Sequence, residues 1–224
     1  MPCGCSDCKT PQYFDDRHAR KELRKYHRAG PRKTTRHLIE QLRASGASGT
    51  LLDIGCGTGI LSFELLEAGL STATCIDAAA ASLSAARAEA DRRALTGRIT
   101  WTEGDFVELA GSVPGADVVT LDRVVCCYPA YRPLLEQAAQ HSRRYLALVY
   151  PRERWLVRLV IGLENLWLRI RGTEFRAFVH SPTAIDEVLR NAGFTVSRGD
   201  RTLVWEARLY ARPSFRELSA PPPS

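Results

Sequence analysis

Three closely spaced glycines after an apolar run constrain the fold of this chain more than any other feature. Residues 51–59 read LLDIGCGTG, and a helix-like pattern follows from Ile60. Glycine adopts backbone conformations that side chains hinder, and it lets the backbone approach a ligand closely. We therefore predict a strand, a ligand-binding turn and a helix of an α/β fold. The alternative is a tight turn that binds nothing.

Strand-like and helix-like segments alternate along most of the sequence. Strands are expected at 50–54, 72–76, 99–103, 118–121 and 145–150, with helices at 60–68, 80–94 and 131–141. Two more strands, 194–198 and 202–210, are separated only by SRGDR, which predicts an antiparallel hairpin. This order predicts an α/β, Rossmann-like, doubly wound sheet of seven strands, mostly parallel with one antiparallel strand.

The ends of the chain differ in composition from its centre. We expect a flexible, cysteine-rich leader at 1–11, a single domain at 12–212 and a flexible Pro/Ser tail at 213–224. Within the domain, helices at 12–46 would form a lid and 152–182 would form a largely helical insertion after the fifth strand.

Nothing in the sequence suggests export or membrane insertion. There is no secretory signal pattern, and the longest apolar stretch, 155–168, is interrupted by charged residues and is too short to span a bilayer. Seven cysteines are an odd number, which favours reduced thiols over a disulfide framework. These features predict a cytoplasmic protein.

The net charge of +6 comes entirely from the N-terminal part of the chain. Residues 1–50 hold 11 Lys and Arg against 5 Asp and Glu, whereas residues 51–224 hold 20 of each. An anionic partner such as nucleic acid is one interpretation. A solvated basic helix is the other, and we favour it.

The glycine spacing argues against a dinucleotide ligand. The dinucleotide pattern is G-x-G-x-x-G, but here the third glycine, Gly59, comes one residue early and is followed by Ile60. Asp53, two residues before Gly55, is also unexpected beside phosphates. A carboxylate at this position suits a cationic ligand better.

Four aspartates fall at or near the carboxyl ends of four successive strands. Asp53, Asp77, Asp105 and Asp122 occupy these positions. Because the carboxyl ends of parallel strands meet at one edge of a sheet, we expect the four to face one crevice. Such a row favours a ligand with a ribose, an amine and a positive charge.

The segments LDIGCGTG, CID and EGDF together resemble the class I S-adenosylmethionine-dependent methyltransferases, with motifs over about residues 34–150. The resemblance implies S-adenosylmethionine as cofactor. It places the glycine loop against the methionine part, Asp77 at the ribose hydroxyls, and Asp105 at the adenine amino group with Phe106 packing nearby. The cofactor-binding residues implied are Asp53, Gly55, Cys56, Gly57, Gly59, Asp77, Ala78, Gly104, Asp105, Phe106 and Asp122.

The loop after the fourth strand, LDRVVCCYPAYRP, is expected to form part of the acceptor site. Many small-molecule members of the family have a histidine-rich segment where Cys126, Cys127, Tyr128 and Pro129 stand here, so no histidine base carries over. The Asn/Asp-Pro-Pro-Tyr/Phe tetrad typical of amino-methyltransferases acting on adenine or glutamine amides is also missing. We expect Tyr128 to contact the acceptor, and the two cysteines to be buried apolar residues or acceptor contacts.

The insertion predicts an amphipathic helix. At helical spacing, Arg154, Arg158, Asn165 and Arg169 share one side, and Trp155, Leu159, Leu163, Leu166 and Ile170 lie on or beside the opposite one. We expect the apolar side to cover the acceptor site, with Trp155 as an acceptor contact. Packing in a dimer is a second interpretation and lying on a membrane surface is a third.

His180 is the candidate general base, because its unperturbed pKa suits a phenol, carboxylate or amine acceptor. Tyr128 is the second candidate catalytic residue. The alternative for His180 is a packing role in a loop. The leader thiols Cys3, Cys5 and Cys8 have no obvious fourth ligand for zinc, so we predict no metal site.

We therefore predict a methyltransferase acting on oxygen, or on nitrogen or carbon, of a small and partly apolar molecule, as a monomer or homodimer. Three alternatives remain: an RNA methyltransferase, supported by the basic leader; a cofactor-binding regulator without catalysis; and a metalloid methyltransferase using Cys126, Cys127 and the leader thiols.

Overall fold

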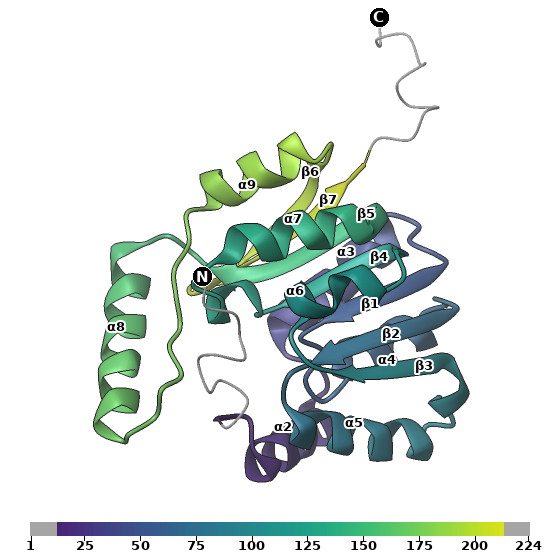
Figure 1. The fold of residues 1–224 in the computed structure, drawn as a ribbon, viewed down its shortest axis with the longest axis horizontal. Helices are drawn as coiled ribbons and strands as arrows, with labels where there is room; N and C mark the ends of the chain where they lie inside the picture. Colours follow the sequence, from purple (N-terminus) through teal and green to yellow (C-terminus); the bar gives the residue numbers. More distant parts are fainter. Residues whose placement is uncertain (1–12, 213–224) are drawn as a thin grey trace, which may run out of the picture.

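A seven-stranded sheet forms the centre of the computed structural model, which describes residues 13–212 (Figure 1). The predicted leader at 1–11 and tail at 213–224 lie outside these residues. The strands are β1 (Thr50–Ile54), β2 (Thr72–Asp77), β3 (Ile99–Glu103), β4 (Ala116–Asp122), β5 (Ser142–Pro151), β6 (Thr195–Arg201) and β7 (Trp205–Ala211). Their spatial order is β3-β2-β1-β4-β5-β7-β6.

The first five strands are parallel, and β7 inserts antiparallel between β5 and β6. The strand order runs outward in one direction through β1, β2 and β3 and in the other through β4 and β5. The change of direction lies between β1 and β4. In open α/β sheets ligands bind at this point, outside the carboxyl ends of the strands. The predicted fold class is therefore confirmed.

Two helical layers cover the sheet and each buries its own apolar cluster (Figure 1). Leu134, Leu135 and Ile185 belong to one cluster, whereas Leu38, Phe63 and Ala86 belong to the other. The first layer has α6 (Phe106–Leu109), α7 (Tyr131–His141) and α9 (Pro182–Asn191). The second has α3 (Lys33–Ala44), α4 (Ile60–Glu67) and α5 (Ala80–Arg92).

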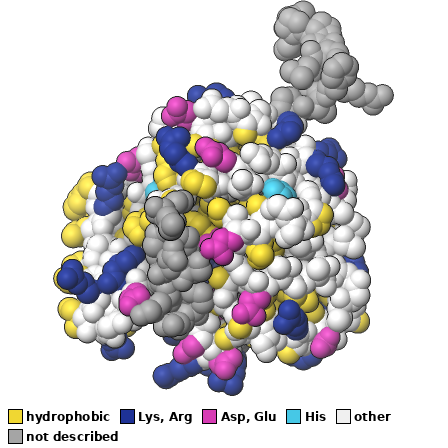
Figure 2. Space-filling model, in the orientation of Figure 1, with side chains coloured by type: hydrophobic (Ala, Val, Ile, Leu, Met, Phe, Trp, Pro, Cys, Tyr) yellow, Lys and Arg dark blue, Asp and Glu magenta, His cyan; other side chains and the backbone are white. Residues whose placement is uncertain are grey.

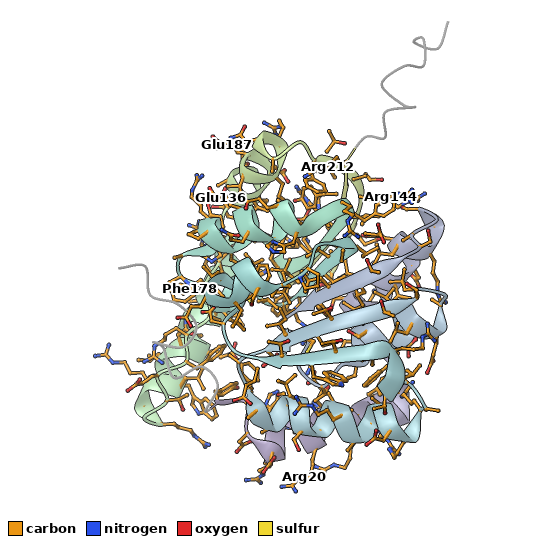
Figure 3. All side chains as sticks on the ribbon, turned by 45° about the vertical axis from the view of Figure 1, so that its right-hand side comes forward. Arg20, Glu136, Arg144, Phe178, Glu187 and Arg212 are labelled. Atoms are coloured by element: carbon orange, nitrogen blue, oxygen red, sulfur yellow. The ribbon has the colours of Figure 1, made fainter. Side chains whose placement is uncertain are left out.

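Helix α2 (Asp16–Ala29) adds a basic lid beside α5. Asp15 caps its first turn by accepting from the backbone N–H of His18 at 2.8 Å, and Gly30 ends it with φ of 71°. Tyr26 holds it in place by donating to Glu64 at 2.7 Å. The cations of this helix, such as Arg20, point away from the molecule (Figure 3). This is the geometry of a solvated basic helix.

The connection in the C-terminal hairpin differs from the prediction. SRGDR was expected to turn, but Ser197–Arg201 continue β6 and the turn lies at Thr202–Val204. Thr202 closes that turn, because its hydroxyl accepts from the N–H of Trp205 at 2.9 Å. Strand β6 is an exposed edge strand, so it lacks the apolar alternation by which a strand is recognised.

Helix α8 (Trp155–Ile170) presents the opposite face to the one expected. It packs through Val157, Ile161 and Leu168, which are buried, whereas its larger apolar side faces outward. We call this side the α8 stripe: Trp155, Leu159, Leu163, Leu166, Trp167 and Ile170, each at least half exposed. The expectation that these residues cover the acceptor site is wrong. Within residues 13–212, no helix combines the length and apolar character needed to cross a bilayer.

Candidate active site

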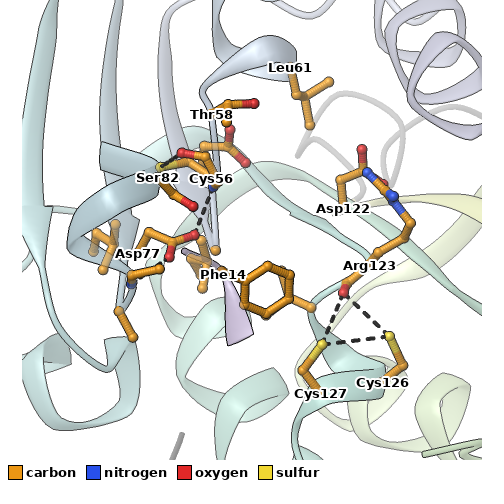
Figure 4. A pocket seen from close by; sticks show the side chains of 18 of the residues that line it. Phe14, Cys56, Thr58, Leu61, Asp77, Ser82, Asp122, Arg123, Cys126 and Cys127 are labelled. Atoms are coloured by element: carbon orange, nitrogen blue, oxygen red, sulfur yellow. Dashed lines mark hydrogen bonds and ion pairs between the residues drawn. The ribbon is translucent and has the colours of Figure 1, made fainter. Parts of the chain in front are cut away.

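A cavity of about 310 Å³ lies at the carboxyl ends of β1 to β4, where the strand order changes direction (Figure 4). All four predicted aspartates line it, as do the other predicted cofactor residues except Gly59. The cavity is enclosed further by the lid, by the loop after β4 and by the segment after α8. Drug-sized ligands occupy pockets of roughly 300–1,000 Å³, so this cavity can hold an extended small molecule.

The glycine loop takes backbone conformations that favour glycine. Gly55, Gly57 and Gly59 have φ of +65°, +55° and +77°. A Cβ on Gly55 would collide with the side chain of Val124 at 2.4 Å, and one on Gly59 would collide with Phe63 at 2.8 Å. At Gly57 the nearest atom to such a Cβ is Glu22 Oε2 at 3.9 Å. Gly57 therefore faces open space that a ligand can approach.

Asp53 lies beneath this loop rather than in it. Its carboxylate is buried and accepts hydrogen bonds from the hydroxyls of Ser62 and Thr120, both at 2.7 Å. Burial raises the pKa of Asp53 to about 7, opposed in part by these two hydrogen bonds. Asp53 thus ties β1 to α4 and β4, and it supports the loop as predicted.

Asp77 joins the loop to the second strand. One carboxylate oxygen accepts from the N–H of Gly57 at 2.7 Å and the other from the N–H of Ala79 at 2.8 Å. Each carboxylate oxygen has a second lone pair, so ribose hydroxyls can still donate to it. Burial raises the pKa of Asp77, partly offset by the two backbone donors.

Asp105 and Tyr128 form a buried pair at the same cavity. The hydroxyl of Tyr128 donates to Asp105 Oδ1, which also accepts from the N–H of Val107 at 2.9 Å at the start of α6. Both residues line the cavity, but Tyr128 is only 4% exposed. The hydroxyl predicted to contact an acceptor is therefore directed at Asp105.

Several polar side chains that the sequence did not indicate lie around Asp122 and the glycine loop. Thr35 from α3 donates to Asp122 at 2.5 Å, and Arg123 lies beside the same carboxylate. Glu22 from the lid accepts from Arg32 at 2.9 Å and from the hydroxyl of Thr58 in the glycine loop at 3.3 Å. The cations can thus pair with a carboxylate on a ligand, and the carboxylates can pair with an ammonium on the same ligand.

Aromatic rings from two distant segments meet in the wall of the cavity. Tyr13 stacks on Phe175 with ring centroids 4.7 Å apart, and Phe14 meets the edge of Phe175 at 5.7 Å. His18 contacts Phe14 at 5.1 Å. These four residues, the aromatic cluster, all line the cavity. Figure 4 shows the Phe14 ring between Asp77 and the two cysteines of the β4 loop.

The cysteine pair follows β4 in a short helical turn, η3 (Val125–Cys127). The sulfurs of Cys126 and Cys127 are 3.9 Å apart, and both thiols donate to the carbonyl of Arg123. Hydrogen bonding with Cys126 and burial raise the pKa of the Cys127 thiol. Both cysteines line the cavity, and their role as acceptor contacts stays a prediction. A protonated thiol such as that of Cys127 is a weak nucleophile.

His180 and Trp155 lie away from the cavity. The Nε2 atom of His180 lies 2.9 Å from the carbonyl oxygen of Tyr128, and the backbone N–H of Phe178 donates to the carbonyl of Cys126 at 2.7 Å. His180 therefore clamps the β4 loop to the segment after α8, which corrects its predicted place in the site. Trp155 is 72% exposed on the α8 stripe. A helical pattern shows two faces but does not tell which one packs.

The cavity fits the cofactor that the sequence resemblance implies. It has an open backbone approach at Gly57, carboxylates at Asp77 and Asp105 for hydroxyl and amino donors, and a mixed-charge end at Asp122 and Arg123. Across residues 13–212, no group of three or more His, Cys, Asp or Glu side chains is placed to hold a metal ion. Cys3, Cys5 and Cys8 fall in the leader, beyond what the structure describes.

Comparison with known proteins identifies a domain and a fold. Residues 51–147 match the family described as "Methyltransferase domain". Magnesium protoporphyrin IX methyltransferase from Synechocystis PCC 6803, with bound SAH, is 21% identical over 81% of this chain and 83% of its own, with a TM-score of 0.67. An O-methyltransferase family protein from Burkholderia thailandensis is 18% identical over 81% of this chain and 57% of its own, with a TM-score of 0.66.

Human N-acetylserotonin methyltransferase, in complex with SAM, is 21% identical over 81% of this chain and 52% of its own, with a TM-score of 0.59. No curated protein gives a significant sequence match. At these identities the solved structures establish the fold alone, and residues 51–147 add a methyltransferase domain. The chain therefore contains a methyltransferase domain and has the fold of S-adenosylmethionine-dependent methyltransferases.

Proposed function

We propose that this enzyme transfers the methyl group of S-adenosylmethionine to an oxygen, or to a nitrogen or carbon, of a small and partly apolar molecule. One observation carries the proposal. The aromatic cluster and Cys127 line the same cavity that holds the row of four aspartates. An acceptor bound among those rings would lie next to the cofactor site and away from water.

The cofactor would lie along the carboxyl ends of the strands. The resemblance and the geometry together support Asp77 at the ribose hydroxyls, Asp105 at the adenine amino group, and Phe106 packing near the base. Arg32 and Arg123 would pair with the carboxylate of the methionine part, and Glu22 or Asp122 with its ammonium. The cofactor supplies an activated methyl group, so the protein mainly positions the two reactants.

His18 replaces His180 as the proposed general base. It lines the cavity, and burial lowers its pKa, so its imidazole is neutral at pH 7 and able to accept a proton from a hydroxyl or ammonium. From a hydroxyl the proton leaves for the imidazole as the methyl group moves, whereas an ammonium gives up its proton first, because its nitrogen has no free electron pair until then. Tyr128 and His180 are proposed to position Asp105 and the β4 loop rather than to touch the acceptor.

The cytoplasm remains the proposed location, because the four cysteines within residues 13–212 are all free thiols. RNA is the alternative acceptor, because helix α2 is basic and basic surfaces bind phosphates without sequence preference. The experiment below distinguishes the two.

Methyl transfer from labelled S-adenosylmethionine tests the proposal. The panel should contain phenols, aromatic carboxylates, aromatic amines and a pool of structured RNA, with arsenite as a further acceptor. We expect label in an organic-extractable small molecule. Label that enters only RNA or arsenite, or none in any acceptor despite tight cofactor binding, would contradict it.

A further inference from the structure

The α8 stripe is the largest concentration of exposed apolar side chains in the described chain. Trp155 is 72% exposed and Ile170 is 76% exposed, and Leu156 and Val160 widen the stripe. Figure 2 shows hydrophobic side chains gathered at the edge of the molecule formed by α8. Monomeric proteins rarely leave so continuous an apolar surface uncovered, because its exposure to water is unfavourable.

Arginines border this stripe. The segment from residue 152 to residue 176 holds six Arg and three Glu. The three glutamates are exposed as well, and Glu153 is paired with Arg158 at 2.5 Å, so six Arg against three Glu leave this segment a net charge of +3. Arg154, Arg158 and Arg169 are 4 and 11 residues apart, which places them on one flank of the helix. All three are exposed.

The two tryptophans add a third feature. Trp155 stands at the first position of α8 and Trp167 lies in its last turn, where Arg171 packs over the indole at 4.1 Å. Indole rings favour the interface between hydrocarbon and polar headgroups, and arginine side chains extend from apolar surfaces toward charged groups. Helix α8 therefore has apolar residues for the acyl boundary, aromatic anchors near each end and cations for anionic headgroups.

We propose that the α8 stripe docks the enzyme on the surface of an anionic phospholipid bilayer, with α8 lying in the plane of the interface. A helix of 16 residues is about 24 Å long, so it would rest on the surface rather than cross it. The charge pattern favours lipid over a second copy of the chain. A two-fold contact pairs the same patch with itself, and where the two α8 helices pack antiparallel it brings the arginine flanks of both copies to the same side.

The position of the stripe gives this docking a consequence for the reaction. Glu164 on α8 and Phe175 just after it both line the cavity. The cavity wall is thus built in part by the helix that would touch lipid. An apolar acceptor dissolved in the membrane would have a short path to the aromatic cluster. This consequence rests on the proposed function, whereas the docking itself does not.

Vesicle flotation of the full chain tests the docking. We expect the protein to float with phosphatidylcholine vesicles containing about one third phosphatidylglycerol at low salt, and to bind pure phosphatidylcholine and high-salt samples much less. The emission of the tryptophans should shift to shorter wavelength on binding. The double variant Leu163→Gln and Ile170→Gln should bind the anionic vesicles at least about tenfold more weakly than the unmodified protein.

Matched controls separate the stripe from general effects. Val196→Gln changes an apolar residue that is 50% exposed on β6, away from α8, and should bind vesicles like the unmodified protein. Arg154→Gln with Arg169→Gln should weaken binding to the anionic vesicles and flatten its salt dependence. Titration with S-adenosylhomocysteine should be unchanged in all variants, which shows that each is folded and leaves the proposed methyl transfer untouched.

Two results would overturn the docking. One is the absence of flotation with anionic vesicles at low salt. The other is a dimer by light scattering that the Leu163→Gln and Ile170→Gln changes convert to a monomer, because the stripe would then be an interface between copies of this chain.

Discussion

The backbone N–H of Gly57 donates a hydrogen bond of 2.7 Å to a carboxylate oxygen of Asp77. This bond connects the turn after β1 to the end of β2 and so fixes the shape of the cavity where the strand order changes direction. It also joins the glycine loop to an aspartate that lies 20 residues later in the chain.

Replacing Asp77 by Ala should weaken the binding of S-adenosylhomocysteine by about 1–3 kcal/mol, which is roughly a factor of five to 150. The change removes the acceptor for ribose hydroxyls and leaves the N–H groups of Gly57 and Ala79 without their partner. Calorimetric titration measures the effect. Glu103→Ala, at an exposed carboxylate at the end of β3, is the control, and equal affinity in both variants would contradict the ribose assignment.

Gly57→Ala should abolish most cofactor binding, because the new methyl group would stand in the open approach to the loop. Its backbone strain must be separated from this effect. Gly46→Ala provides the control, since Gly46 has a φ of +64° close to the +55° of Gly57 and has open space around it, but it does not line the cavity. Thermal denaturation should show a similar loss of stability in both variants.

Only Gly57→Ala should then lose affinity for S-adenosylhomocysteine in a calorimetric titration. Equal affinities for the two variants would mean that the loop does not contact the cofactor.

His18→Gln should lower turnover by about 10²-fold or more while leaving the affinity for S-adenosylhomocysteine nearly unchanged, because it removes the proposed base. His180→Gln is the matched comparison, since this histidine holds the β4 loop from outside the cavity. It should lower the melting temperature and reduce turnover less. Single-turnover rates with an acceptor found in the labelled screen decide between them, and the reverse ranking would restore His180 as the base.

The stability of the protein should depend on pH through Asp53. Burial raises its folded pKa to about 7 from an ordinary value near 3.8, so the folded state binds a proton that the unfolded state releases between these values. The contribution of this proton to the free energy of unfolding therefore falls as pH rises from about 4 to about 7. Above that range the contribution no longer changes with pH.

Asp53→Asn removes this titration. The free energy of unfolding of the unmodified protein, relative to the variant, should fall by about 3 kcal/mol between pH 5 and pH 8. Urea denaturation at the two pH values measures it. A difference that does not change with pH would show that Asp53 is ionised throughout.

The sheet could be predicted from the sequence because its strands are buried. In β1, for example, four of five residues are buried, so the strand reads as an apolar run that ends at the glycines. The row of aspartates followed from strand order alone. Strand β6 could not be delimited, because its exposed residues leave no periodic pattern.

The aromatic cluster in the cavity wall could not be predicted for a different reason. Tyr13 and Phe175 are 162 positions apart, and only the docking of the lid against the segment after α8 brings their rings together. The orientation of α8 was missed because both of its faces carry apolar residues: Val157, Ile161 and Leu168 pack inward while the larger stripe stays outside.

A crystal structure of the chain with S-adenosylhomocysteine tests the central claim most directly. The account predicts ribose hydroxyls on Asp77, the adenine near Asp105 and Phe106, and the sulfur facing the aromatic cluster beside Cys127. A nucleoside bound outside this cavity, or a sulfur turned away from Phe14 and Phe175, would contradict it.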